Sequence, residues 1–356
     1  MKTALIGPLQ SGKSTLFAAI SGRAIAPTGT MTIEEAIVSV PDERIEWLNE
    51  YYKPRKKVYA SIDCLDIPGF NFNDEHGRAA ARKLINGIRT VDLLVLVIRA
   101  FQNPAVPPYK NSVDPARDLQ DLKTELLLSD LELVSTRIDK LEKQSSKPSK
   151  TQAQDKTQIE LFKRLQQTIE QEQPISSAVR DDQETEMVKS LGFLTLKPMV
   201  VAVNSGEDNK NQTFDFSKII DSTIPVIYIC AELDYELSKL DQASRRDFMA
   251  ELGISESAVS KFVRSCYSAM GLISFITVVH NELHCWPVRE GTAALDAAGK
   301  VHTDIKRGFI RAETFNFEEL KKLGDEKAVK AAGKIRLEGK DYIVRDGDII
   351  NFRFNV

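Results

Sequence analysis

The sequence lacks any apolar run long enough to cross a bilayer, which argues against an integral membrane protein. It also lacks a leader-like amino terminus, because Gly7 ends the short apolar run Ala4–Ile6 at once, so we expect no signal peptide. Only four cysteines occur and none forms a CxxC pair, which indicates reduced thiols in a cytoplasmic protein. No tandem repeat is visible.

An excess of basic charge is also missing. Lys and Arg number 48 against 51 Asp and Glu, for a formal net charge of −3. This balance excludes a bulk polycation that coats nucleic acid, although local basic surfaces remain possible. The 356 residues, 42% hydrophobic and 28% charged, are typical of a soluble globular chain with two or three domains.

Short β-rich runs alternate with helical stretches in the first hundred residues, and two more such runs follow near residues 200 and 225. This alternation predicts a doubly wound α/β domain. We expect a helix over Lys13–Ser21. The expected strands are Thr3–Ile6, Val58–Leu65, Leu93–Ile98, Met199–Val203 and Ile224–Ile229.

The region between the two halves of this α/β pattern has helical periodicity. Apolar residues recur at helical spacing over Asp118–Lys143 and again over Ile159–Ile169, with the polar stretch Gln144–Thr157 between them. This pattern predicts an antiparallel helical hairpin whose loop is that polar stretch. After about residue 275, β-rich runs and glycine turns predict a small α+β domain. The expected domains are residues 1–117 with 195–275, the hairpin insertion 118–194, and residues 276–356.

A phosphate-binding loop follows the first expected strand directly. Residues Gly7 to Ser14 read GPLQSGKS, which fits GxxxxGK[ST], and they open the expected helix. Glycines let backbone N–H groups curl around phosphate, and the helix amino terminus adds a favourable dipole. We expect Lys13 to reach the β- and γ-phosphates of a nucleoside triphosphate and Ser14 to ligate Mg²⁺. The candidate nucleotide-binding residues here are Gly7, Gln10, Ser11, Gly12, Lys13, Ser14 and Thr15.

A second nucleotide-contacting loop is expected where the run Val58–Leu65 ends. Residues Asp66 to Gly69 read DIPG and match DxxG, which is an ordinary turn by itself but is informative downstream of a P-loop. The pattern predicts that Asp66 lies near Mg²⁺, through water, and that the Gly69 N–H lies near the γ-phosphate. Together the two loops predict a P-loop nucleotide hydrolase with a Ras-like GTPase core.

Base recognition is expected after the strand Met199–Val203. GTPases carry NKxD there, and its Asp accepts hydrogen bonds from guanine, whereas this chain has Asn-Ser-Gly-Glu at 204–207. The longer acid Glu207 weakens the preference for guanine, while Asn204 can offer its side-chain carbonyl to the adenine amino group. A polar surface turn is the alternative. The place of the second base-contacting loop is taken by Cys230, Ala231 and Glu232.

Over essentially its whole length the sequence resembles the YchF/Obg-like ATPase family. The resemblance rests on segments 40–48 (VPDERIEWL), 112–119 (SVDPARDL), 197–207 (KPMVVAVNSGE), 297–313 (AAGKVHTDIKRGFIRAE) and 333–356 (GKIRLEGKDYIVRDGDIINFRFNV). It implies ATP hydrolysis with Mg²⁺, a coiled-coil insertion, a carboxyl-terminal TGS domain, and association with the ribosome, especially its large subunit, or another RNA–protein complex. It also implies a switch threonine, Thr32, that contacts Mg²⁺ and the γ-phosphate.

Departures from the family pattern fall on the hydrolytic side. The segment after DxxG reads FNFNDEHGRAAARKL (Phe70–Leu84) in place of a glycine-rich one, and Pro108 occupies the position of a family histidine. Phe70 follows DxxG, where many switch GTPases carry a water-orienting Gln, and it cannot hydrogen-bond to water. Slow hydrolysis is therefore expected. His76 is the remaining candidate for positioning water, against the simpler interpretation of a surface histidine.

Three functions remain open from the residues alone. The first is an ATP-driven switch with slow basal turnover, bound to a ribosome or another RNA–protein partner. The second is a nucleotide-binding scaffold with negligible hydrolysis. The third is a GTPase in which Glu207 tolerates guanine.

Weaker signals are ambiguous. His280 and His284 are four residues apart, but the intervening Glu is one place late for a zinc-protease pattern, so packed or solvated histidines are the simpler interpretation. The charges of the helical hairpin nearly cancel and fit either a solvated face or a ribosome contact. The same ambiguity holds for Arg307, Arg311, Lys334 and Arg336, between RNA contact and solvation.

Overall fold

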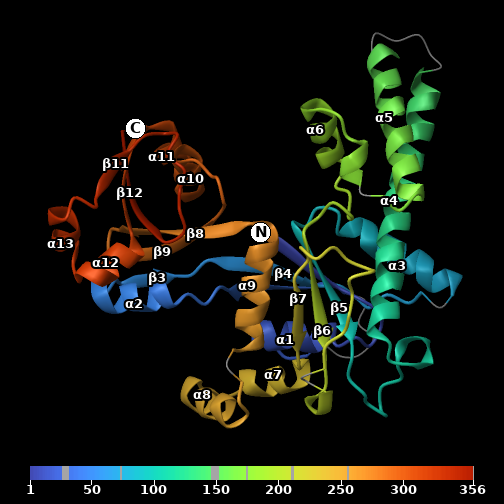
Figure 1. Cartoon of the computed structure of the whole chain (residues 1–356), viewed down its shortest axis with the longest axis horizontal. Helices are drawn as coiled ribbons and strands as arrows, with labels where there is room; N and C mark the ends of the chain where they lie inside the picture. Colours follow the sequence, from blue (N-terminus) through green and yellow to red (C-terminus); the bar gives the residue numbers. More distant parts are fainter. Residues whose placement is uncertain are drawn as a thin grey trace. The chain divides into compact units, whose positions relative to one another are not determined.

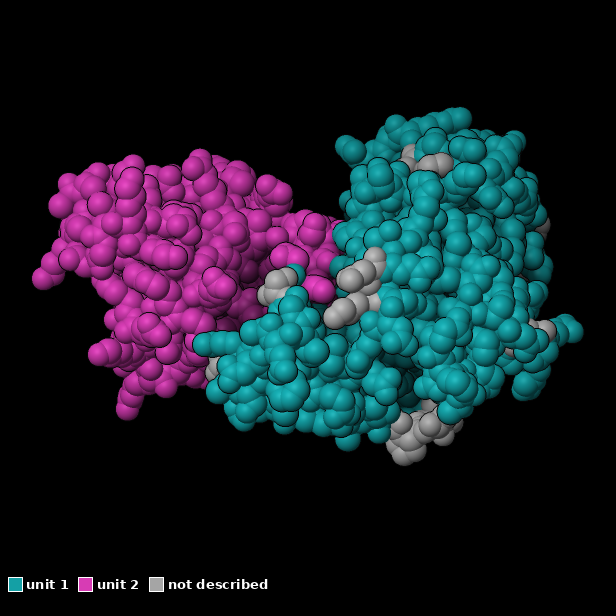
Figure 2. All heavy atoms as spheres, turned by 60° about the horizontal axis from the view of Figure 1, so that its bottom comes forward, with its two compact units in different colours: residues 1–36, 64–258 teal, residues 37–63, 259–356 magenta. Residues whose placement is uncertain are grey.

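The computed structural model of the chain describes residues 1–25, 32–72, 74–145, 152–173, 175–209, 212–254 and 256–355. The chain forms two compact units (Figure 2), residues 1–36 with 64–258 and residues 37–63 with 259–356. The sequence-based division places residues 37–63 in the α/β domain, whereas the structure groups them with the carboxyl-terminal residues. One reason is that strand β3 (Lys56–Val58) pairs with β9 (Glu282–Arg289).

The first unit is built on a six-stranded sheet in the order β2-β4-β1-β5-β6-β7 (Figure 1). The pairs β1–β5, β5–β6 and β6–β7 are parallel. Strands β5 and β6 are buried along their whole length, which explains their uninterrupted apolar sequence. The predicted α/β class is therefore confirmed. The strands are β1 Lys2–Ile6, β2 Glu34–Ser39, β4 Ser61–Asp66, β5 Leu93–Arg99, β6 Met199–Asn204 and β7 Val226–Ile229.

Helices α3 and α4 contribute to one hydrophobic core with the sheet, in which Ile85 and Leu119 pack with strand residues such as Leu96. Helix α1 packs against α7 and spans the predicted residues. The helices of this unit are α1 Lys13–Ser21, α3 Glu75–Gly87, α4 Pro115–Ser145, α5 Gln152–Glu170, α6 Asp182–Ser190, α7 Ala231–Ser238 and α8 Gln242–Glu251. Its 3-10 turns are η1 Tyr109–Asn111, η2 Ile175–Ala178 and η3 Glu207–Asn209.

The helical hairpin is made by α4 and α5, which lie side by side (Figure 1). The first turns of α4 belong to the sheet core through Leu119 and Leu126, and its later turns join a second core with α5 and α6 through Val134 and Leu141. One continuous helix therefore links the sheet to the hairpin. The predicted loop Gln144–Thr157 is too long, because α4 continues to Ser145 and α5 begins at Gln152; residues 146–151 lie outside the described ranges.

The expected single β-run Val58–Leu65 is wrong as one strand. It is split into β3, which ends at Val58, and β4, which begins at Ser61. The two strands belong to different sheets, since β3 pairs in parallel with β9 while β4 lies between β2 and β1. The physical reason is a non-local pairing that local β propensity does not report.

The second unit is α+β, as predicted, with a sheet in the order β11-β10-β12-β8-β9-β3. Its core joins Phe275, Ala298 and Phe352. Strands β8 and β9 form a hairpin whose turn residues His280 and Asn281 have φ of 51° and 65°. The remaining elements are α2 Glu43–Tyr52, α9 Ala258–Met270, β8 Leu272–Val279, α10 Ala294–Val301, α11 Thr303–Arg307, β10 Phe309–Asn316, α12 Phe317–Leu323, α13 Glu326–Ala331, β11 Arg336–Glu338 and β12 Asp348–Phe354. Over the described ranges of both units, no helix combines the length and apolarity that crossing a membrane needs.

Candidate nucleotide site

The loop between β1 and α1 is held in a tight turn that requires glycine at two positions. A Cβ at Gly7 would lie 2.3 Å from the Val97 carbonyl oxygen, and a Cβ at Gly12, whose φ is 87°, would lie 2.0 Å from Asn204 Nδ2. Helix α1 begins without a side-chain cap and without an acidic residue in its first turn. Its first N–H groups therefore remain available to an anion, and the helix dipole favours one there.

Lys13 is folded back over this loop. Its side chain is buried, and Nζ donates hydrogen bonds to Gly7 O at 3.1 Å, Pro8 O at 2.9 Å and Ser11 Oγ at 3.4 Å. Burial lowers the pKa of Lys13 to about 8, and the nearby Asp66 opposes that shift. The ammonium is thus held by neutral acceptors in a place where an anion would stabilise its charge.

Asp66 ends strand β4 beside the same loop. Its side chain is 6% exposed, and its Oδ1 atom has no hydrogen-bond partner. Burial raises the pKa of Asp66, while a hydrogen bond from Ser14 and the charge of Lys13 lower it, and Glu34 adds to the rise. A buried carboxylate oxygen without a partner is costly, and pairing it with a cation removes that cost. The oxygens of Asp66 and Ser14 are the hard donors that Mg²⁺ prefers.

The DxxG loop is attached to the phosphate loop through the backbone. Phe70 N donates to Gly7 O at 3.1 Å, and Leu9 N donates to Phe70 O at 3.0 Å. A Cβ at Gly69 would lie 2.9 Å from Leu9 Cα, so only glycine allows this approach. The Phe70 ring is fully buried and packs beside Phe72. The position that carries a water-orienting Gln in many GTPases is therefore occupied by an inward-facing aromatic ring.

Asn204 connects the phosphate loop to the loop before α7. Its Nδ2 donates to Ser11 O at 3.1 Å, and its Oδ1 accepts from Ala231 N at 3.0 Å. The side chain is buried. The sequence did not predict this link; the Oδ1 atom that it assigned to the adenine amino group accepts one backbone N–H here, and the base contact stays a prediction. Asn204 therefore holds the phosphate loop and the loop before α7 together.

The other residues predicted to contact the base come from the same two loops as Asn204 and Ala231. Ser205 is buried and its hydroxyl has no hydrogen-bond partner, while Glu207 is exposed at the start of η3. Cys230 is half-buried at the amino terminus of α7, burial raises its pKa, and Glu232 is exposed in the first turn. The two loops thus carry two exposed carboxylates, Glu207 and Glu232, and the half-buried Cys230 thiol.

Phe101 was not identified from the sequence. A Cβ added at Gly12 would lie 3.6 Å from the Phe101 ring. A Cβ added at Gly206 would lie 3.5 Å from the Phe101 Cβ. The Arg99 guanidinium packs over the ring at 4.3 Å from its centroid. The half-buried ring thus stands between the phosphate loop and the loop after β6. The only sequence signal was its place two residues after a buried parallel strand, since ligands gather at the carboxyl ends of such strands.

Two predicted site residues are not in contact with the phosphate loop in the structure. Thr32 is exposed and follows directly on residues 26–31, which lie outside the described ranges. His76 is exposed in the first turn of α3, next to the helix cap Asp74. The structure therefore favours the surface interpretation of His76.

The histidine pair in the second unit is not arranged as a metal site. His280 lies in the β8–β9 turn, and His284 stacks on Trp286 and lies 2.9 Å from a carboxylate oxygen of Glu282. Across the described part of the chain, no three His, Cys, Asp or Glu side chains are grouped to hold a metal ion. His284 therefore fits the packed interpretation, and the exposed His280 fits the solvated one.

Comparison with known proteins gives matches over the whole chain. Residues 2–205 match a family model described as 50S ribosome-binding GTPase, and residues 272–355 match the YchF-GTPase_C model, described as a protein of unknown function. The chain is 35% identical to the ribosome-binding ATPase YchF of Bacillus subtilis over 99% of this chain and 98% of that protein. It is 36% identical to Obg-like ATPase 1 of Oryza sativa subsp. japonica, over 100% and 92% respectively.

A solved structure has the same fold. The YchF GTPase of Schizosaccharomyces pombe superposes with a TM-score of 0.81 at 29% identity, covering 99% of this chain and 97% of that one. The names of these relatives differ in the nucleotide they imply, with ATPase for two and GTPase for the third.

Proposed function

The chain belongs to the YchF/Obg-like ATPase family, and from this premise we propose that it is a Mg²⁺-dependent, ATP-binding and ATP-hydrolysing switch that associates with ribosomes. One observation supports the nucleotide part most directly. The buried Lys13 ammonium, the Ser14 hydroxyl and a buried Asp66 oxygen without a partner converge at the amino terminus of α1. A Mg²⁺–triphosphate complex would stabilise the ammonium charge and give the Asp66 oxygen a partner.

In this proposal the P-loop backbone from Gly7 to Thr15, including Gln10 and Ser11, holds the phosphates. Lys13 contacts the β- and γ-phosphates, and the Gly69 N–H faces the γ-phosphate. Ser14 and Asp66 would hold Mg²⁺, and the family resemblance implies Thr32 as a further ligand. Bound Mg²⁺ would neutralise charge on the phosphate oxygens.

For the base, we assign Asn204 a positioning role in place of a direct contact. Because it fixes the Cys230–Glu232 loop to the P-loop, it sets where the base is bound. The ring of Phe101 is available to stack on the base. Glu207 is one methylene longer than the Asp with which GTPases recognise guanine. Adenine therefore remains the proposed base, and a GTPase is the alternative function.

The proton balance of nucleotide binding should show that Lys13 takes part. Phosphate stabilises the ammonium, so binding raises its pKa above the value of about 8 in the free protein. Below that pH Lys13 is already charged, and above it binding must take up a proton, so affinity falls as pH rises. Calorimetry with Mg·ATP in buffers of different ionisation enthalpy should give uptake near zero at about pH 7 and near one proton at about pH 9.5. Zero uptake throughout would contradict the role of Lys13.

Hydrolysis should be slow, because Phe70 occupies the position of the water-orienting Gln and cannot hydrogen-bond to water. We expect single-turnover ATP hydrolysis well below the roughly 10 s⁻¹ median of enzymes. His76→Ala should leave that basal rate unchanged, because the side chain is exposed in the first turn of α3. The measurement is rapid-quench hydrolysis of Mg·ATP by both proteins, with and without ribosomes.

The outcomes of this measurement separate the open functions. Basal turnover at tens per second would refute slow hydrolysis, and a large drop in His76→Ala would make His76 a water-positioning residue. Binding of ATP without any turnover, even with ribosomes, would favour the nucleotide-binding scaffold. Hydrolysis of GTP in preference to ATP would favour the GTPase.

The partner proposal follows from the family. A relative is named a ribosome-binding ATPase, and the model matching residues 2–205 is described as 50S ribosome-binding. We propose that residues 1–117 with 195–275 bind the nucleotide, and that the coiled-coil hairpin 118–194 and the TGS domain 276–356 contact the large ribosomal subunit. The proposed location is the cytoplasm.

A further inference from the structure

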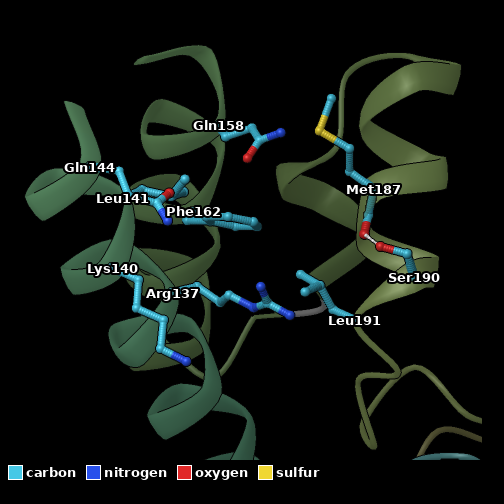
Figure 3. Close-up of a pocket in the computed structure, with 9 residues that line it drawn as sticks. All are labelled: Arg137, Lys140, Leu141, Gln144, Gln158, Phe162, Met187, Ser190 and Leu191. Atoms are coloured by element: carbon cyan, nitrogen blue, oxygen red, sulfur yellow. Dashed lines mark hydrogen bonds between the residues drawn. The ribbon is translucent and has the colours of Figure 1, made fainter. Parts of the chain in front are cut away.

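A groove runs between the hairpin helices α4 and α5 and the short helix α6 (Figure 3). Its cavity volume is about 210 Å³. The ring of Phe162 lies at its centre, and Arg137 extends from α4 toward Leu191 at the end of α6 (Figure 3). The apolar lining residues are Leu141, Phe162, Met187 and Leu191, and the polar ones are Arg137, Lys140, Gln144, Gln158 and Ser190.

The walls of the groove are fixed by the hairpin core. Leu141 and Phe162 belong to this core, and Met187 and Leu191 of the α6 segment pack against it. Arg164 of α5 pairs with Glu184 of α6 at 2.6 Å, and the Arg180 N–H donates to the other oxygen of Glu184. The groove is therefore preformed, which reduces the conformational entropy lost when a ligand binds.

The charge on the rim is one-sided. Arg137 and Lys140 stand one turn apart on α4, and both are exposed. Neither has an ion-pair or hydrogen-bond partner among the described residues, whereas Lys163 pairs with Glu142 and Lys189 with Glu186 close by on the same module. Two unpaired like charges at this spacing repel each other slightly, and an anionic group over them would relieve that repulsion.

The size and chemistry of the groove favour one class of ligand. A volume near 210 Å³ is below the range of about 300–1,000 Å³ typical of small-molecule sites, so it fits one or two side chains and not a cofactor. Its lining of aliphatic, thioether and aromatic groups suits a large apolar side chain. Single-stranded RNA prefers a longer basic track, whereas the lining of this groove holds two cations, Arg137 and Lys140.

We propose that this groove docks an acidic segment of a ribosomal protein, one that places a large apolar side chain over Phe162 and carboxylates over Arg137 and Lys140. The proposal rests on the ribosome association proposed above and names the part of the partner that this surface binds. Electrostatic attraction gives the contact its salt dependence, and the apolar anchor gives it specificity.

The first test reverses the rim charge. Arg137→Glu with Lys140→Glu in the full chain should weaken binding to purified ribosomes at least tenfold, while ATP affinity and thermal unfolding stay as in wild type. The matched control is Lys163→Glu with Lys189→Glu, which makes the same charge change on the same module outside the groove lining, and it should weaken binding less than threefold. Equal losses in the two variants would overturn the proposal. Wild type that fails to bind ribosomes in any nucleotide state would instead refute the proposed function, and the docking proposal with it.

The second test identifies what occupies the groove. A benzophenone amino acid placed at Ser190 should cross-link, under ultraviolet light and with purified ribosomes, to an acidic peptide of a ribosomal protein that mass spectrometry can sequence. The same amino acid at Glu186, outside the groove lining, should give a weaker or different adduct. Cross-links from position 190 to ribosomal RNA alone, or to basic peptides only, would overturn the proposal.

Discussion

Lys13→Ala is expected to weaken Mg·ATP binding by about 3 kcal/mol or more, which is over a hundredfold in Kd. The substitution removes an ammonium that donates into the phosphate loop, where Nζ is held within 3.4 Å of three acceptors. A hydrogen bond from a charged donor to phosphate in a buried site is among the stronger polar contacts. Calorimetry or a fluorescent ATP analogue measures the loss.

The control for this prediction is stability. Because burial of the Lys13 charge is unfavourable, its removal should not lower the unfolding midpoint, so a loss of binding cannot be attributed to a loss of fold. Lys83→Ala, at an exposed position on α3, should bind Mg·ATP like the wild type. Wild-type affinity in Lys13→Ala would show that the loop is not the phosphate site.

Gly12→Ala is expected to destabilise the first unit by about 3–4 kcal/mol and to abolish nucleotide binding. The new Cβ would lie 2.0 Å from Asn204 Nδ2, at a φ of 87° that disfavours alanine by about 1–2 kcal/mol. Asn204 would have to move and give up its hydrogen bonds to Ser11 O and Ala231 N, each worth about 1 kcal/mol. Urea unfolding followed by circular dichroism gives the free energy of unfolding.

Gly22→Ala supplies the matched comparison at the other end of α1. Gly22 has a φ of 69°, but a Cβ there meets nothing within 4 Å. Gly22→Ala should therefore lower the free energy of unfolding only by the backbone cost of positive φ, about 1–2 kcal/mol, and should keep Mg·ATP affinity. Equal destabilisation at positions 12 and 22 would mean that the Asn204 link contributes nothing to stability.

The loops that come directly after a single predicted strand could be located from the sequence. The P-loop pattern predicted where α1 begins, and the predicted span Lys13–Ser21 agrees with the structure, in which Gly12 and Gly22 at positive φ flank the helix. The uninterrupted apolar runs of β5 and β6 identified buried parallel strands, and their order brings the loops after β1, β4 and β6 to one edge of the sheet.

The parts that depend on contacts between distant residues could not be predicted. The link that the Asn204 amide makes between Ser11 and Ala231, which lie 193 and 27 residues away, was not among the expected contacts. The break between β3 and β4 depends on pairing with β9, more than 200 residues later. Phe101 carries no motif, and only the fold places it beside Gly12. Such contacts are chosen by tertiary packing and not by local propensity.

The hairpin shows a third kind of limit. Apolar periodicity located both helices, but the polar stretch between them was assigned to a loop although its two ends are helical. Gln, Lys and Ser are compatible with a solvated helix, so polarity alone does not end one. The groove beside α6 was also hidden, because it depends on how Met187 and Leu191 pack against α4 and α5.

The proposed switch requires that ATP control binding to the ribosome, and co-sedimentation with purified ribosomes measures this control. The measurement compares the protein with no nucleotide, with Mg·ADP, and with non-hydrolysable analogues of ATP and of GTP at equal concentration. A nucleotide acts as a switch only if it binds the two states with different affinity. We predict that the ATP analogue changes the fraction bound at least tenfold relative to ADP, and that the GTP analogue does not. The same fraction bound in all four conditions would contradict control of ribosome binding by ATP.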